Sequence, residues 1–233
     1  MRPKNLKGPL SWEERRPLIY DRILFVPTYY DRHHEWVFPG WESPEVFGRR
    51  APLEIEYCSG NGDWIVEKAK AHPERNWVAV EKQFERVQKI WSKMHNFSLS
   101  NLFIVCGEAL TFTRFYVPDA SFDAIYINFP DPWPKEKHAK KRLIQEPFIS
   151  QMARSSSSGA SVTIVTDDPT YTAQINKSML ANHSWTPCFS EPYYVNTWEN
   201  YGTSYFDSLW RQKGLTIYFM QYLISADSKE KTG

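Results

Sequence analysis

The chain has 233 residues, of which 42% are hydrophobic, and a formal net charge of only +1. This length and composition suit a packed α/β domain, and one domain with an N-terminal extension is the simplest organisation. No apolar run is long enough for a membrane span and no signal-peptide core follows the basic first residues, so we expect a cytoplasmic protein without membrane contact. The cysteines Cys58, Cys106 and Cys188 lack metal-type spacing, which argues against a disulfide framework and against a metal site.

The first 50 residues show no sustained hydrophobic period and mix Pro, Trp, Arg and His. We predict that residues 1–50 form an irregular extension that packs on a main domain at 51–226. Residues 227–233 are polar and are predicted to be a frayed tail.

The regular pattern begins with a strand, a glycine turn and a helix. Leu53–Tyr57 is predicted to be a strand, residues 58–62 a tight turn, and Asp63–Ala71 a helix that ends before Pro73. The further predicted elements are strands at 77–80, 102–105, 122–127 and 162–165, helices at 84–94, 144–154 and 171–180, a weak edge strand at 186–189 and a final strand at 216–224. Residues 155–159 are predicted to be a polar turn and residues 193–210 an aromatic loop. This alternation indicates an α/β fold with a mostly parallel seven-stranded sheet, an antiparallel C-terminal strand and helices on both faces.

The glycine turn and three strand-end carboxylates favour a cofactor of the nucleoside type. The turn lets the backbone approach a nucleoside, and Glu81 at the end of the second strand can accept ribose hydroxyls. Ile65 stands where the third glycine of the dinucleotide fingerprint would fall, so NAD is disfavoured. Glu56 would repel a pyrophosphate and attract a cation. With Glu108 near an adenine edge, this set fits S-adenosylmethionine, which carries an ammonium and a sulfonium but no phosphate.

The segment 129–143 follows the fourth predicted strand and combines a stiff acidic loop with a cationic run. Three prolines alternate with Asp131 and Trp133, and they hold the loop extended. Five Lys or Arg residues and two acidic residues then give a local charge of +3, which suits an anionic partner. Charge runs alone are more typical of a solvated surface, but the end of a central strand is where α/β sheets bind ligands. We therefore predict a functional site here.

The run Asn128-Phe-Pro-Asp131-Pro-Trp133-Pro-Lys135, followed by His138 and Lys140-Lys-Arg142, resembles the signature of the bacterial tRNA (guanine-N7)-methyltransferases. Weaker similarity extends from about residue 47 to residue 222. The resemblance implies a Rossmann-like class I methyltransferase fold, S-adenosyl-L-methionine as cofactor and tRNA as substrate. It also implies methylation of guanine N7 at position 46.

The resemblance and the reasoning above together assign candidate residues. The candidate catalytic residue is Asp131. The candidate cofactor-binding residues are Glu56, Gly60, Gly62, Glu81, Glu108, Asn128 and Asp131. The candidate substrate-binding residues are Lys135, His138, Lys141, Arg142, Asp167, Ser204, Tyr205, Phe206 and Asp207, among which Lys135, Lys141 and Arg142 are expected to hold phosphates.

Four positions depart from the family pattern. Cys58 replaces the first glycine of the cofactor loop, Glu108 stands where Asp is usual, and Ser204 and Asp207 stand where the family has Thr and Glu. Two alternatives stay open at this point. One is a methyltransferase that acts on another RNA base, such as an adenine amine, and the other is a catalytically silent RNA-binding relative, which Cys58 favours. The sequence leaves a monomer and a homodimer equally open.

Overall fold

A computed structural model describes residues 1–8, 16–199, 201–202 and 204–225. The chain divides into two compact units, Met1–Pro118 (unit 1) and Asp119–Gly233 (unit 2), and each unit is described by itself. The predicted polar tail at 227–233 lies outside the described residues.

The described residues of unit 1 include strands in the order β1-β2-β5-β4-β3. Its strands are β1 (Leu18–Tyr20), β2 (Ile23–Phe25), β3 (Leu53–Tyr57), β4 (Asn76–Glu81) and β5 (Leu102–Cys106), and its helices are η1 (Pro3–Asn5), η2 (His33–Glu35), α1 (Asp63–Ala71), α2 (Phe84–Asn96) and α3 (Ala109–Tyr116). Strands β2 to β5 pair in parallel, whereas β1 is antiparallel to β2. Every residue of β3 and β4 is buried, as expected for parallel strands covered on both faces.

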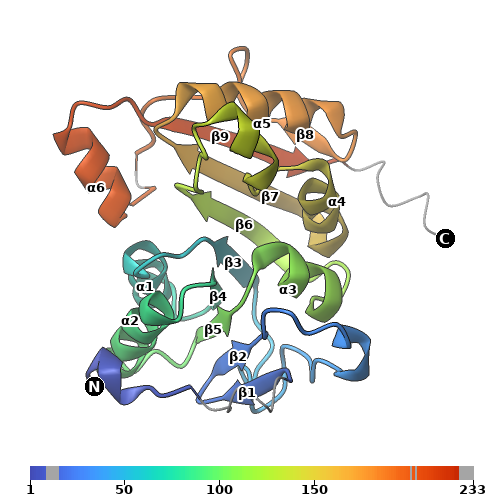
Figure 1. Cartoon of the computed structure of the whole chain (residues 1–233), viewed down its shortest axis with the longest axis vertical. Coiled ribbons are helices and arrows are strands. Elements are labelled where there is room, and N and C mark those ends of the chain that lie inside the picture. Colours follow the sequence, from blue (N-terminus) through green and yellow to red (C-terminus); the bar gives the residue numbers. More distant parts are fainter. Residues whose placement is uncertain (9–15, 200, 203, 226–233) are drawn as a thin grey trace. The chain divides into compact units, whose positions relative to one another are not determined.

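Helices cover both faces of the unit 1 sheet. On one face, the Trp64 ring of α1 meets the Trp77 ring of β4 with centroids 6.1 Å apart. On the other face, the Tyr57 hydroxyl of β3 lies 2.7 Å from the Thr113 hydroxyl of α3. Tyr57 pairs with Val80 in the sheet, so it points away from the side that Trp77 occupies. Figure 1 shows α1 and α2 together on one side of these strands and α3 on the other.

The N-terminal segment is more regular than the sequence predicts. Strands β1 and β2 fall inside the supposedly irregular residues 1–50, and β2 extends the sheet beside β5. Ile23 and Leu24 are fully buried there, and the Val26 amide donates to the Cys106 carbonyl at 2.9 Å. The apolar run Ile23–Phe25 is too short to show a hydrophobic period in the sequence. It forms a strand because it pairs with β5.

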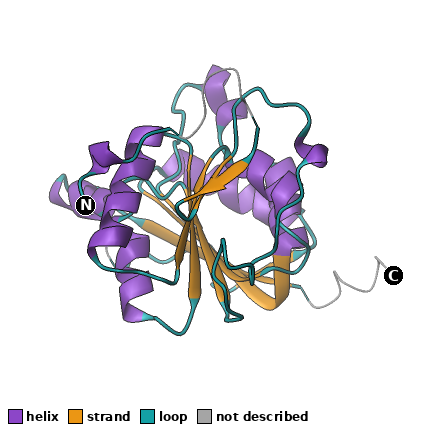
Figure 2. Ribbon diagram, turned by 90° about the horizontal axis from the view of Figure 1, so that it is seen from below, coloured by secondary structure: helices purple, strands orange, loops and turns teal. Residues whose placement is uncertain are grey.

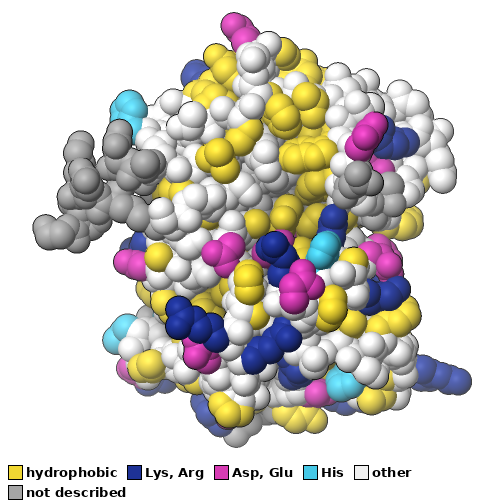
Figure 3. Space-filling view, turned by 180° about the vertical axis from the view of Figure 1, so that it is seen from behind, with side chains coloured by type: hydrophobic (Ala, Val, Ile, Leu, Met, Phe, Trp, Pro, Cys, Tyr) yellow, Lys and Arg dark blue, Asp and Glu magenta, His cyan; other side chains and the backbone are white. Residues whose placement is uncertain are grey.

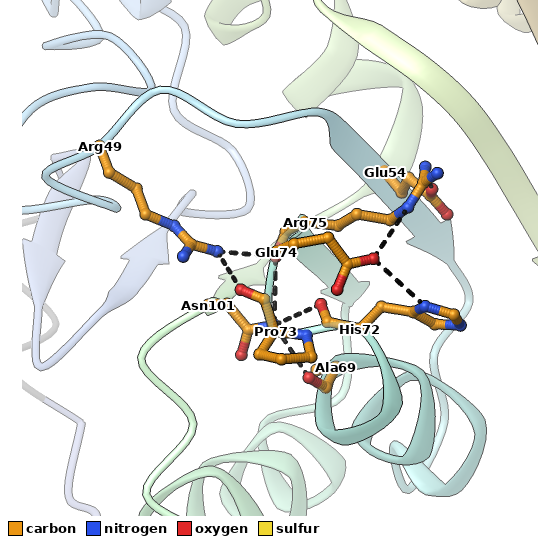
Figure 4. Close-up of polar contacts among 8 residues, drawn as sticks. All are labelled: Arg49, Glu54, Ala69, His72, Pro73, Glu74, Arg75 and Asn101. Carbon is orange, nitrogen blue, oxygen red and sulfur yellow. Dashed lines mark hydrogen bonds and ion pairs between the residues drawn. The ribbon is translucent and has the colours of Figure 1, made fainter.

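A polar network ties together the loops that precede β4 and β5 (Figure 4). The Asn101 side-chain amide donates to the carbonyls of Ala69, His72 and Arg75 at 2.9–3.1 Å, and Arg49 donates to the Arg75 carbonyl at 3.0 Å. These bonds satisfy backbone acceptors at the end of α1 and directly before β4. That edge of the unit 1 sheet is therefore structural, and the predicted site residues lie at the opposite, carboxyl edge.

The part of unit 2 that the structure describes contains strands in the order β6-β7-β9-β8. Its strands are β6 (Phe122–Asn128), β7 (Ser156–Thr166), β8 (Trp185–Pro187) and β9 (Tyr218–Ile224), and its helices are η3 (Glu136–Lys141), α4 (Glu146–Ser155), α5 (Pro169–Ala181) and α6 (Tyr205–Gln212). Strands β6 and β7 are parallel, and β9 runs antiparallel to both of its neighbours, which confirms the predicted antiparallel C-terminal strand. Helix α5 packs along β7, β9 and β8.

Two predictions in unit 2 are wrong. Residues 156–159 belong to β7 rather than to a turn, because Ser157 bonds Asp123 of β6 at 2.8 Å and a shift in register absorbs the extra residues. Gly159 adopts a φ of +77° there. The predicted aromatic loop at 193–210 contains helix α6, which begins after Ser204.

Figure 2 shows the strands flanked by helices, and no helix in the described part of the chain is long and apolar enough to cross a bilayer. On the face drawn in Figure 3, Lys and Arg side chains lie among Asp and Glu side chains.

Candidate active site

The glycine turn after β3 is a tight loop of left-handed residues. Cys58, Gly60 and Gly62 have φ values of +60°, +56° and +75°. The Ser59 amide donates to the Val80 carbonyl at 3.1 Å, which fixes the loop at the carboxyl end of β4. A Cβ at Gly62 would lie 2.7 Å from the side chain of Ile90, so only glycine fits between the loop and α2. The predicted turn is therefore present and closely packed.

Two buried carboxylates flank this turn. Glu56 of β3 is 2% exposed and Glu81 of β4 is 5% exposed. Glu56 pairs with Ala79, two residues before Glu81, so both side chains leave the sheet on the same face. Glu81 accepts the Gly60 amide at 3.0 Å and the Gln83 amide at 2.9 Å. A carboxylate has about four acceptor positions, so Glu81 keeps capacity for hydroxyl donors.

Helix α2 holds the loop from outside. Lys89 donates to the Asn61 side chain at 3.1 Å, and Lys93 donates to the Asn61 carbonyl at 2.9 Å and to Asp63 at 2.5 Å. Arg86 lies 3.7 Å from Glu81. Sequence reasoning missed this clamp, although the spacing of the three cations places them on one helix face.

The third predicted carboxylate, Glu108, caps a helix. It is exposed, and its two oxygens accept the amides of Leu110 and Thr111 at 3.0 and 2.6 Å at the start of α3. The adjacent Gly107 amide donates to the Glu81 carbonyl at 3.1 Å, which brings the ends of β4 and β5 together. A contact between Glu108 and a cofactor stays a prediction.

Cys58 occupies a left-handed conformation that costs an L-residue about 1–2 kcal/mol. Burial, and next the neighbouring Glu81 charge, raise the pKa of its thiol to about 12, so the thiol is neutral at pH 7. We expect Cys58→Gly to be more stable than Cys58→Ala by about 1 kcal/mol, because both lose the thiol and only glycine relieves the backbone. Denaturant unfolding of the two variants measures the difference. Equal stabilities would mean that the loop carries no strain at this position.

In unit 2 the loop after β6 holds Asp131 at its exposed tip. Phe129 and Trp133 on either side have φ values of +50° and +41°, which are strained for bulky residues. The Trp133 amide donates to Asp131 Oδ1 at 3.2 Å. Upstream, the Tyr201 hydroxyl donates to the buried Asn128 Oδ1 at 2.7 Å. Tyr201 is a contact that sequence reasoning missed.

Helix η3 places two predicted RNA contacts around Trp133. The Lys141 ammonium lies 4.8 Å from the Trp133 ring centre, and the His138 ring meets Trp133 edge-on at 5.7 Å. Lys135 and Lys141 are both exposed. The Asp131 loop is therefore followed by exposed cations, Lys135 directly before η3 and Lys141 at its end.

Arg142 does not belong to that accessible set. It is 7% exposed, and it donates to the Pro132 carbonyl at 2.7 Å and to Gln174 of α5 at 2.7 Å. Its guanidinium lies 5.1 Å from the Tyr171 ring centre. The structure uses donors of Arg142 to hold the Asp131 loop, and its predicted contact with a phosphate stays a prediction. Neither Gln174 nor Tyr171 carries a sequence signal that would have indicated this.

Asp167 follows β7 and lies half-buried two residues after Val165, whose carbonyl accepts the Phe129 amide at 2.8 Å. Burial raises the pKa of Asp167 above its ordinary value, and the Asp168 charge adds to the shift. Asp168 itself caps α5 by accepting the Tyr171 amide at 2.7 Å. Asp168 is thus used for the helix cap, and a substrate contact of Asp167 stays a prediction.

The Ser204 and Asp207 pair is a helix cap. Ser204 accepts the Asp207 amide at 3.1 Å, and the buried Asp207 accepts from Arg211 at 3.1 Å. Tyr205 is 53% exposed, while Phe206 lies 6.3 Å from Phe129 between ring centres. The motif therefore docks α6 beside the Asp131 loop. Direct substrate contacts of Ser204 and Asp207 stay predictions.

Within the described residues no group of three or more His, Cys, Asp or Glu side chains is arranged to hold a metal ion. The acidic groups at the strand ends of unit 1 therefore stand as separate hydrogen-bonding carboxylates.

Comparisons with known proteins identify the class and then the family. A family model described as "Putative methyltransferase" matches residues 50–220. The match to the solved structure of the 16S rRNA methyltransferase KamB covers 82% of this chain and 95% of the KamB chain, with a TM-score of 0.59 and 14% sequence identity. A variant of the 16S rRNA (adenine(1408)-N(1))-methyltransferase from Catenulisporales acidiphilia, solved with cosubstrate SAM, covers 74% of this chain and 84% of its own with a TM-score of 0.51 at 15% identity. The fold is that of the Rossmann-like class I methyltransferases, as predicted, with β1 and β2 added to the seven expected strands.

Relatives of known name are much closer in sequence. The tRNA (guanine-N(7)-)-methyltransferase of Chlamydia trachomatis serovar D is 48% identical over 96% of this chain and 98% of its own. The corresponding protein of Rubrobacter xylanophilus is 31% identical over 87% of this chain and 90% of its own. The chain belongs to the tRNA (guanine-N(7)-)-methyltransferase family.

Proposed function

We propose that this protein transfers a methyl group from S-adenosyl-L-methionine to N7 of a guanine in cytoplasmic tRNA, at position 46. The observation that carries the proposal is the pair of buried carboxylates, Glu56 and Glu81, at the ends of adjacent parallel strands beside a left-handed glycine loop. The names of the relatives support the choice of acceptor.

The residues of unit 1 fit this cofactor. A buried carboxylate is costly unless it meets a cation or hydrogen-bond donors, and the cofactor offers both. Glu56 accepts a hydrogen bond from the α-ammonium and Glu81 accepts hydrogen bonds from ribose hydroxyls, while Gly60 and Gly62 supply the left-handed positions of the loop without adding side chains. Glu108 borders the adenine edge, and Asn128 completes the predicted cofactor contacts. When bound, the cofactor supplies a methyl group activated by a sulfonium.

Methylation of guanine N7 requires the base to be positioned correctly, and it does not require a strong general base. Guanine N7 carries an in-plane lone pair and needs no deprotonation, so orientation dominates the catalysis. Positive charge develops on the base as N7 becomes bonded to the methyl group. The exposed Asp131 carboxylate stabilises that charge or accepts hydrogen bonds from the N1 and N2 donors of the base, and Asp167 holds the target nucleotide.

The tRNA contacts come from the surface beside Asp131. Lys135, His138 and Lys141 lie on or next to η3, and the exposed ammonium groups of Lys135 and Lys141 can meet phosphates. Tyr205 and Phe206 offer aromatic surface at the start of α6.

Transfer of a labelled methyl group to unmodified tRNA, followed by nucleoside analysis, tests the proposal. We expect 7-methylguanosine as the only labelled product. Labelled 6-methyladenosine would establish the alternative acceptor. No transfer, together with no heat of binding to the cofactor in calorimetry, would establish the silent RNA-binding relative instead.

A further inference from the structure

The first residues of the chain form a strap along α2. The Met1 carbonyl accepts from Ser92 at 2.7 Å and from Asn96 at 3.1 Å, and the Leu6 carbonyl accepts from Gln88 at 2.9 Å. The strap therefore runs antiparallel to the helix, as Figure 1 shows for the N-terminal segment beside α2. Leu6 is 2% exposed and anchors the strap in the core of unit 1.

This surface carries a concentrated positive charge. Residues 1–8 contain Arg2, Lys4 and Lys7 and no carboxylate, which gives +3. Residues 82–96 contain four Lys or Arg and one Glu, which also gives +3. The whole chain has a net charge of +1, so all other residues together carry −5. A segregation of this size requires an explanation beyond solubility.

Ion pairs among the described residues do not account for the strap cations. On the inner side of α2, Arg86 and Lys93 face Glu81 and Asp63 of the cofactor loop. In contrast, Arg2, Lys4 and Lys7 are exposed, and the structure records no acidic partner for them among the residues it describes. The cationic side chains of the strap are therefore accessible to a ligand in solvent.

We infer that the strap surface, defined by Arg2, Lys4, Lys7 and Lys82, binds the phosphate backbone of RNA, as a second tRNA contact besides η3. The inference rests on the proposed function for its partner. The Leu6 carbonyl accepts from Gln88 near the start of α2, and Lys82 lies two residues before that helix at the carboxyl end of β4, so RNA held along the strap passes that strand end. The apolar residue Leu6 is buried rather than exposed, which favours a polyanion in water over a lipid surface.

The test is the salt dependence of tRNA binding by a triple variant, Arg2→Gln with Lys4→Gln and Lys7→Gln. Each lost phosphate contact lowers the slope of log K against log salt by about one unit, so we expect a loss of about 2–3 units. We expect the tRNA Kd near physiological salt to rise about ten- to hundred-fold, whereas the cofactor Kd stays the same. Unchanged thermal unfolding would show that the strap remains docked.

A matched triple variant distinguishes the effect of the charge on the strap from the effect of the total charge of the protein. Arg32→Gln, Arg50→Gln and Lys70→Gln remove the same three charges, but these side chains already face Glu35, Glu42 and Glu67. We expect the slope of this control to equal that of the parent protein. Equal losses in both triples would overturn the inference, because total charge would then explain the effect.

A photo-crosslinking residue at position 4 gives a direct readout with the same tRNA. We expect a protein–RNA adduct, and binding to anionic vesicles instead of an adduct would assign the surface to a membrane. If the strap triple binds tRNA as the parent does while Lys141→Gln lowers the slope, the strap inference fails and the proposed function stands. If the parent itself transfers no methyl group to tRNA, the proposed function fails first.

Discussion

Replacing Asp131 by alanine is expected to lower kcat for tRNA methylation by about 10²- to 10³-fold, with little change in thermal stability. The carboxylate is exposed, so its removal leaves no buried group unsatisfied. Loss of one group that stabilises charge in the transition state typically costs this much in rate. Single-turnover transfer of a labelled methyl group measures the effect directly.

An isosteric variant distinguishes charge from loop geometry. Asp131 Oδ1 accepts the Trp133 amide at 3.2 Å, and an asparagine keeps that acceptor while losing the charge. We expect Asp131→Asn to be as slow as Asp131→Ala. Full activity in Asp131→Asn would assign Asp131 a structural role in the turn. Asp123→Asn, at the other end of β6, is the control and should retain the parental rate.

Much of unit 1 could be predicted because its signals are local. The predicted bounds of β3 and α1 coincide with those observed, since an apolar strand, two glycines and a helix followed by Pro73 are all adjacent in sequence. The placement of Glu56 and Glu81 at neighbouring strand ends followed from parallel pairing alone. Strand β2 could not be predicted, because a short apolar run becomes a strand only when β5 offers it hydrogen bonds.

Helix α6 shows that one sequence motif can indicate two different roles. Ser204 and Asp207 were singled out as substrate residues, yet their spacing is also that of a helix N-cap and an acidic residue one turn in. The structure uses them for the cap, with Asp207 buried against Arg211. Helix α6 was not predicted, because the aromatic residues between 193 and 210 indicated a loop.

The pair Lys141 and Arg142 shows the limit of reading charge from sequence. The two residues are adjacent cations in one run, and nothing local separates them. The structure leaves Lys141 exposed above the Trp133 ring and buries Arg142 against Gln174, 32 positions further along the chain. Burial of this kind depends on tertiary contacts, so the sequence predicted one role for both residues.

Arg142→Met is therefore expected to act through stability and turnover rather than through RNA affinity. It removes charged donors from the Pro132 carbonyl and from Gln174, which we expect to cost about 3 kcal/mol in the free energy of unfolding. A displacement of the Asp131 loop by about 1 Å would lower kcat about 100-fold. Denaturant unfolding and single-turnover rates measure these two effects.

The neighbouring residue provides the matched comparison. Lys141→Met also removes one charge, but from an exposed side chain, so its unfolding curve should match that of the parent. Its tRNA salt slope should fall by about one unit, whereas the slope of Arg142→Met should stay parental. Arg142→Lys keeps the charge and can reach a single carbonyl, so it should recover part of the rate. If Arg142→Met instead lost salt dependence and kept its stability and kcat, Arg142 would be a phosphate contact after all, and the loop would be held by other residues.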